Sequence, residues 1–371
     1  MKHMTKVRGL SAACLLTVPI LLSGCGLFGS ESAAVDPPPE EIEAQMLEIS
    51  GNTTLDTGVF GPVAEDTGAA AGTRQQEAIA PGERTTVYLQ DSNGLLAPVA
   101  LKLPEGDSNA MLKDSLTALV SQGAYASTVP EGFSGILPAG TEVQNVSIDK
   151  NKIAVVEFNS VFNEYKPADE RTILEAITWT LTGQEGIEGV QLWVDGKKLT
   201  EMPLQGTPLD HPLSRSFGIN LPRNGPVLMN STAVTVYFSA ATPDGTQQYY
   251  VPVTRFVPAG EDRVKAALNE LIAGPESADG LEMVMTGGTA IDSVEAGQNG
   301  VVTVSLTDDM FEDAQNVPAE MLESVVLTVA QNADDAPVQI RLNGQETVTG
   351  TNNVNYGQPV SAPEYVNALA L

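Results

Sequence analysis

The chain repeats an ordered set of short motifs, and this internal repeat limits its possible folds more than any other feature. The segment VQLWVDG at 190–196 returns as VQIRLNG at 338–344, and TVYL at 86–89 returns as TVYF at 235–238. The motifs keep the same order along the chain, which indicates a duplicated domain. Because two copies are too few for a solenoid, the repeat predicts two tandem domains.

Each repeat carries the same alternation of strand and helix patterns. The strand-like segment IAVVEF at 153–158 aligns with VVTVSL at 301–306, and Asp-Gly at 195–196 aligns with Asn-Gly at 343–344, two dipeptides that favour tight hairpin turns. Two stretches of each repeat place apolar residues on one side of a helix. These residues are Leu112, Leu116, Leu119 and Val120, then Ile173, Leu174, Ile177 and Leu181 in the first repeat, and Val264, Leu268, Leu271 and Ile272, then Met321, Leu322, Val325 and Val329 in the second.

These patterns predict an α+β protein built from two tandem domains. Each repeat reads β-β-α-β-β-α-β, and two helices with single apolar stripes are expected to cover one face of a mixed or antiparallel sheet, as a two-layer α/β sandwich. We predict that the first domain spans 85–216, that a connector follows at 217–230, and that the second domain spans 231–368.

The N-terminus has the pattern of a lipoprotein signal peptide over residues 1–24. Basic residues precede an apolar run, Leu10–Leu22, that is shorter than a typical membrane span, and the run ends in LSGC, which resembles the bacterial lipobox. We expect cleavage before Cys25 and attachment of lipid, including palmitate, to this residue. An ordinary signal peptide with an incidental cysteine is the alternative, but the only other cysteine, Cys14, lies within the signal itself.

Residues 25–84 are expected to be a flexible acidic tether behind the lipid. They combine PPP at 37–39 with scattered Gly, Ala, Thr and Ser and few aromatic residues. The lipid would hold both domains at the extracytoplasmic face of the plasma membrane. The formal net charge of −28 disfavours binding to nucleic acid and leaves membrane attachment to the lipid alone.

The mature sequence offers little for catalysis, metal binding or a cofactor. Its one histidine, His211, lies near Asp210 and Ser214 along the chain, but the second repeat has no histidine at the equivalent position. A pair of carboxylates acting on peptidoglycan is the strongest enzymatic alternative, with Glu157 and the acidic loop at 307–315 as candidates. Metal-ligand spacings and a phosphate-binding loop are both missing from the sequence, so we expect a non-enzymatic protein with no metal and no cofactor.

The order of the motifs resembles the GerM domain (GerMN) family of spore-forming and related bacteria. The second copy has TVYF, then YVPVTRFVP at 250–258, a helix ending in LIAGP, then GGT, VVTVSL and a late strand ending in Asn-Gly. The first copy departs from this pattern, since Leu101 stands where the second copy has Arg255. The resemblance implies a binding module of sporulation and germination that helps to assemble or localise a membrane complex between mother cell and forespore. A peptidoglycan-binding or cortex-modifying germination factor is the alternative.

Three residues are candidates for contact with protein partners. Trp193 and Arg341 occupy equivalent positions in the last strand of each repeat, and the charged counterpart indicates that this strand position is exposed. Arg255, within one of the motifs that carry the resemblance, is the third. Trp179 lies in a helical stretch opposite Leu327 and is expected to be in the core.

Overall fold

The computed structural model describes residues 84–221, 230–276 and 280–369. The predicted signal peptide, the lipidation site at Cys25 and the predicted tether up to residue 83 lie outside the described residues. Within the described ranges, no helix is long and apolar enough to cross a membrane.

The first domain begins with a hairpin and ends with a short strand pair. Its helices and strands are β1 (Thr85–Asp91), β2 (Leu96–Leu101), α2 (Ser108–Ala118), β3 (Phe133–Ser134), β4 (Val143–Ile148), β5 (Ile153–Phe158), α3 (Glu170–Thr182), β6 (Gly189–Val194) and β7 (Lys197–Lys198). Single-turn helices lie between them at η1 (Ala126–Thr128), η2 (Ser160–Asn163), η3 (Pro167–Asp169) and η4 (Arg215–Phe217).

The second domain repeats this order without the two shortest strands. It contains β8 (Ser231–Ala241), β9 (Gln248–Pro258), α4 (Arg263–Ala273), β10 (Ala290–Ala296), β11 (Val302–Thr307), η5 (Asp309–Phe311), α5 (Ala319–Asn332) and β12 (Val338–Leu342). The predicted α+β class with two similar domains is confirmed.

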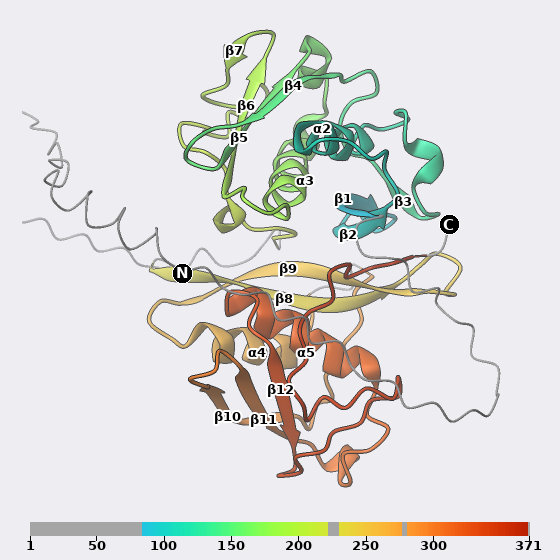
Figure 1. Cartoon of the computed structure of the whole chain (residues 1–371), viewed down its shortest axis with the longest axis vertical. Helices are drawn as coiled ribbons and strands as arrows, with labels where there is room; N and C mark the ends of the chain where they lie inside the picture. Colours follow the sequence, from blue (N-terminus) through green and yellow to red (C-terminus); the bar gives the residue numbers. More distant parts are fainter. Residues whose placement is uncertain (1–83, 222–229, 277–279, 370–371) are drawn as a thin grey trace, which may run out of the picture. The chain divides into compact units, whose positions relative to one another are not determined.

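One detail of the predicted layering differs, because the strands of each domain divide between two sheets. The first domain has sheets of order β2-β1-β3 and β4-β5-β6-β7, and the second has β8-β9 and β10-β11-β12. The parallel pairs β5/β6 and β11/β12 are joined through α3 and α5. In each domain the helices pack between the hairpin and the mixed sheet (Figure 1), so each helix is covered on two sides.

The second covering layer follows from the burial of α3 and α5. Every residue from Ile173 to Leu181 in α3, and from Ser324 to Ala330 in α5, is buried. A helix that is buried all round needs packing partners on opposite sides, which a single sheet face does not provide. The apolar stripes predicted from the sequence lie at the buried positions of α3 and α5, but the buried surface of each helix is wider than its stripe.

The two repeated turns have the predicted backbone conformation. Asp195 and Asn343 have φ angles of 46° and 52°, and the glycines that follow them have 75° and 73°. Positive φ at two successive positions is the geometry that Asp-Gly and Asn-Gly tolerate best. In the first domain this turn joins β6 to β7, which pair through Val194 and Lys197.

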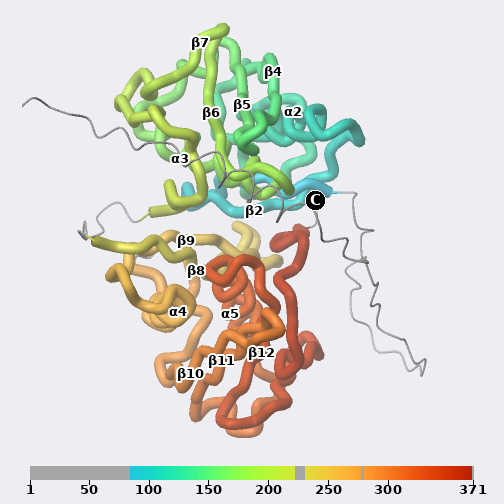
Figure 2. The backbone as a smooth tube through the Cα atoms, turned by 60° about the vertical axis from the view of Figure 1, so that its left-hand side comes forward, coloured from blue at the N-terminus to red at the C-terminus, as the bar shows by residue number. Residues whose placement is uncertain are grey.

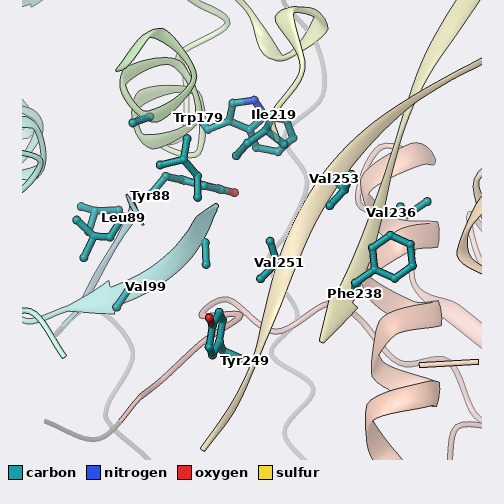
Figure 3. Packing of buried hydrophobic residues seen from close by; sticks show 14 of the residues in the cluster. Tyr88, Leu89, Val99, Trp179, Ile219, Val236, Phe238, Tyr249, Val251 and Val253 are labelled. Atoms are coloured by element: carbon teal, nitrogen blue, oxygen red, sulfur yellow. The ribbon is translucent and has the colours of Figure 1, made fainter. Parts of the chain in front are cut away.

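The two domains share one hydrophobic core where their hairpins meet. All residues of β2 are buried, and β2 lies beside β9 of the second domain (Figures 1 and 2). In Figure 3, Val251 and Val253 of β9 point toward the strand that carries Val99. The ring of Tyr249 packs edge to face on Phe133 with centroids 4.9 Å apart. A continuous cluster of buried apolar residues therefore extends through both domains.

Asn220, in the connector, joins the two hairpins through its side-chain amide. Its Oδ1 accepts a hydrogen bond from the N–H of Leu96 at 2.8 Å, and its Nδ2 donates to the carbonyls of Leu96 at 2.7 Å and Pro252 at 2.8 Å. Asn220 is thus part of the interface between the two domains.

Asn367, near the C-terminus, makes the matching set of bonds from the second domain. Its Oδ1 accepts from the N–H of Tyr250, and its Nδ2 donates to the carbonyls of Tyr250 and Pro98, all at 2.8 Å. Tyr250 and Pro98 stand at the repeat positions of the residues that Asn220 binds. The interface therefore has approximate two-fold symmetry, with Asn220, which follows the first domain, and Asn367 of the second domain each bridging both hairpins.

Candidate functional site

Trp193 and Arg341 lie at equivalent points on the outer faces of the two mixed sheets. In β6 and β12, half-buried residues alternate with buried ones, and both residues belong to the half-buried set. Because side chains alternate across a strand, this set faces away from the helices. Trp193 pairs in register with Glu157 of β5, and Arg341 pairs with Ser305 of β11.

The environment of Trp193 is a half-buried aromatic ring among polar groups. Its neighbours in register are Glu157 and, on β7, Lys198. The indole Nε1 is shielded from solvent, and no group in the described part of the chain accepts a hydrogen bond from it. An amphipathic ring on a sheet face is typical of an interaction anchor.

Arg341 presents a charge at the same point of the second domain. Its side chain is 40% exposed, and Nη2 lies 3.5 Å from Oε1 of Glu346, which is 78% exposed. An exposed ion pair of this kind contributes little to stability. The guanidinium can therefore exchange Glu346 for the carboxylate of a partner at small cost.

Arg255 lies in the interior, away from the surface that a binding role requires. Its side chain is 5% exposed, Nη1 lies 3.0 Å from Oε1 of Glu276, and the guanidinium carbon is 5.9 Å from the ring centroid of Phe238. Among the described residues, neither Nε nor Nη1 has an acceptor at a hydrogen-bonding angle, so Nη1 meets Glu276 as a charge only. The burial explains why the first repeat can carry Leu101 here, since both side chains fill interior space.

The carboxylates near the predicted sites are engaged by groups of their own chain. Glu157, the candidate acid in β5, accepts a hydrogen bond from the N–H of Gly196 at 2.8 Å and so holds the β6–β7 turn. Asp308, in the acidic loop, is 1% exposed and accepts bonds from the hydroxyls of Thr286 and Thr289. Burial raises the pKa of Asp308, but the hydrogen bonds from these hydroxyls lower it by more, so the net pKa lies below its usual value.

Glu170 is a buried carboxylate that the sequence patterns did not reveal. It accepts from the hydroxyl of Tyr165 and the N–H of Gln205, both at 2.7 Å, and from the N–H and hydroxyl of Thr207. Burial raises its pKa, and these donors together bring it below the usual value. Glu170 thus holds the segment after β7 against α3. A glutamate at the start of a helix is the one local signal it offers.

His211 does not form a catalytic triad with its neighbours in sequence. Its side chain is 89% exposed, with Nε2 3.5 Å from Oδ2 of Asp210. The hydroxyl of Ser214 bonds instead to the hydroxyl of Ser216 at 2.7 Å. Among the described residues, no cluster of three or more histidine, cysteine or acidic side chains is arranged to hold a metal.

A cavity of about 510 Å³ lies between the two domains, beside the ends of α3 and α5. Trp179 is fully buried next to it, as expected for a core residue, and its Nε1 donates to the carbonyl of Gly218 at 2.9 Å. The guanidinium carbon of Arg215 lies 4.5 Å from the centre of this indole ring. Sequence reasoning missed the cavity because its wall is shared between both repeats, although the repeated tyrosines of TVYL and TVYF line it.

Comparison with known proteins relates both repeats to one family. The family model described as Germane: Sporulation and spore germination matches residues 86–200 and 235–348. The Spore germination protein GerM of Bacillus subtilis (strain 168) is 34% identical over 365 residues, which cover 96% of this chain and 97% of the relative.

A solved structure shows the same tandem arrangement. The tandem GerMN domains of the sporulation protein GerM from Bacillus subtilis are 35% identical, with a TM-score of 0.71, and the match covers 77% of this chain and 99% of that chain. A structure of the first GerMN domain of that protein is 40% identical over 36% of this chain and 97% of its own length, with a TM-score of 0.34.

Proposed function

Because the chain belongs to the Germane family of sporulation and spore germination proteins, we propose that it is a lipid-anchored, non-enzymatic binding protein of that process. In this proposal Cys25 attaches it to the extracytoplasmic face of the plasma membrane. The two domains then bind protein partners and help to assemble or localise a membrane complex between mother cell and forespore.

The outer face of the first mixed sheet is the observation that carries the binding role. Trp193 presents a half-buried aromatic ring there, in register with Glu157 on one side and Lys198 on the other. Aromatic residues of this kind dominate the binding energy of many protein interfaces. The engaged state of Glu157, Glu170 and Asp308 supports a binding function over hydrolysis, since each carboxylate already holds a turn or loop.

Site-specific crosslinking in sporulating cells tests this face. A photo-crosslinking amino acid at position 193 is expected to capture a membrane protein, and the same amino acid at Asn299, in an exposed turn of the second domain, serves as the control. Capture of the same protein from both positions, or of none from position 193, would remove this face from the proposal.

The anchor is tested separately by Cys25→Ala. We expect the variant to keep the circular dichroism spectrum of the folded domains while moving from the membrane fraction to the soluble extracytoplasmic fraction, with loss of function in proportion. Membrane association that survives the substitution would mean that the attachment lies elsewhere, such as in an uncleaved Leu10–Leu22 segment.

Peptidoglycan binding is the second candidate, and the same face favours it. Glu157 and Gln191 flank Trp193 on the sheet, and a ring beside a carboxylate and a carboxamide suits a glycan strand as well as a protein. Sedimentation with purified murein sacculi distinguishes the two candidates. Binding to sacculi that depends on Trp193 supports peptidoglycan binding. No binding to sacculi, together with a protein crosslink from position 193, supports a role in a membrane protein complex.

A further inference from the structure

The cavity between the domains lies on their approximate two-fold axis. Residues from equivalent repeat positions line it in pairs, namely Tyr88 with Tyr237, Thr182 with Ala330, Gly183 with Gln331, and Arg215 with Ala362. Its volume of about 510 Å³ is within the usual range of roughly 300 to 1,000 Å³ for small-molecule sites. A site of this kind exists only when both domains are in place.

The two tyrosines form the symmetric part of the wall. Tyr88 and Tyr237 are each 4% exposed, and the hydroxyl of Tyr237 donates a hydrogen bond to Oε1 of Gln331 at 3.4 Å (Tyr88 appears beneath Trp179 in Figure 3). Burial raises the pKa of both hydroxyls, so they stay protonated and offer polar contacts without charge at neutral pH.

The charged groups break this symmetry. The first domain supplies Arg215, whose Nη1 donates to Gln331 at 2.8 Å and whose Nε donates to Thr182 at 3.3 Å. Since a guanidinium has five N–H donors, these two hydrogen bonds leave other N–H groups of Arg215 to donate to a ligand. The second domain supplies carboxylates instead, from Asp334, Asp335 and Glu364. Tyr237 lies close enough to Arg215 and Asp335 for both charges to act on its hydroxyl.

From this arrangement we infer that the cavity is a binding site for a small zwitterion, a free amino acid or a short peptide with charged termini. Its carboxylate pairs with Arg215, and its ammonium group pairs with the carboxylates of the second domain. A simple anion is disfavoured because three carboxylates line the cavity against one guanidinium, and a simple amine leaves Arg215 without a new partner. The inference is independent of the membrane anchor and of the sheet face that carries Trp193.

Calorimetry with alanine and trialanine on the purified full-length chain tests the site. We expect saturable binding of one molecule per chain for at least one probe, and binding at least about tenfold weaker after N-acetylation or C-amidation of that probe. The double variant Asp334→Asn, Asp335→Asn should weaken binding by a similar factor. Asparagine suits this pair because both positions have positive φ, 50° and 58°, which asparagine also tolerates.

The matched control is Asp309→Asn with Asp313→Asn, which makes the same charge change at exposed positions outside the cavity lining. It should bind as the wild type does. Arg215→Gln should also weaken binding of the probe at least about tenfold. If the variant fails to fold because Arg215 no longer stacks on Trp179, the C-amidated probe tests the contact with Arg215 in the wild-type protein. Absence of saturable binding, equal binding of blocked probes, or equal losses in the test and control pairs would each overturn the inference.

Discussion

Asn367→Ala is expected to destabilise both domains, although the residue lies only a few positions from the end of the chain. Its side chain is 4% exposed and makes three hydrogen bonds of 2.8 Å to β2 and β9. Alanine leaves the carbonyls of Pro98 and Tyr250 and the N–H of Tyr250 without these partners. At about 1 kcal/mol for each bond, the free energy of unfolding should fall by about 2 to 4 kcal/mol.

Urea unfolding measured with two probes checks this value. Both tryptophans, Trp179 and Trp193, belong to the first domain, so their fluorescence reports that domain while far-ultraviolet circular dichroism reports both. Because the domains share one core, the two probes should give one midpoint in the wild type and a common, lower midpoint in the variant.

Asn145→Ala is the matched control, since Asn145 is exposed on the edge strand β4. Its effect should stay within about 0.5 kcal/mol. The reasoning is refuted if Asn367→Ala costs no more than this control, or if it shifts the circular dichroism transition and leaves the tryptophan transition in place.

Two further substitutions test buried charges. Glu170→Gln should cost about 2 to 4 kcal/mol at pH 7, because an amide replaces a carboxylate that accepts four hydrogen bonds. Because the folded pKa of Glu170 is lowered, its contribution to the free energy of unfolding is complete above the ordinary pKa of 4.5 and is lost as the pH falls through the lower folded pKa. Between pH 7 and pH 3, the urea midpoint should therefore fall more in the wild type than in the variant. Equal falls would contradict this role of Glu170. Arg255→Met should leave the free energy of unfolding within about 1 kcal/mol of wild type, because the buried guanidinium lacks a hydrogen bond at Nε, whereas Glu276→Gln should destabilise by leaving that charge without its partner. A larger loss from Arg255→Met than from Glu276→Gln would show that the ion pair itself stabilises the domain.

Much of the fold was predictable from local sequence patterns. The repeat predicted two domains, and the strand and helix order followed from periodicities that each segment carries by itself. The Asp-Gly and Asn-Gly turns were equally predictable, since positive φ is a property of those residues. The equivalence of Trp193 and Arg341 also followed from the alignment of the repeats and holds in the two sheets.

Only the tertiary structure decided which surfaces meet. A sequence stripe shows one buried side of α3 or α5, but burial of the other side depends on a hairpin brought there by the fold. The place of Arg255 in the interior depends in the same way on Phe238 and Glu276. Gln205 and Thr207, two of the three residues that donate to Glu170, lie 35 and 37 positions from it along the chain, and the walls of the inter-domain cavity come from different repeats. Local periodicity determines each element, whereas contacts between distant segments depend on the packing of all of them together.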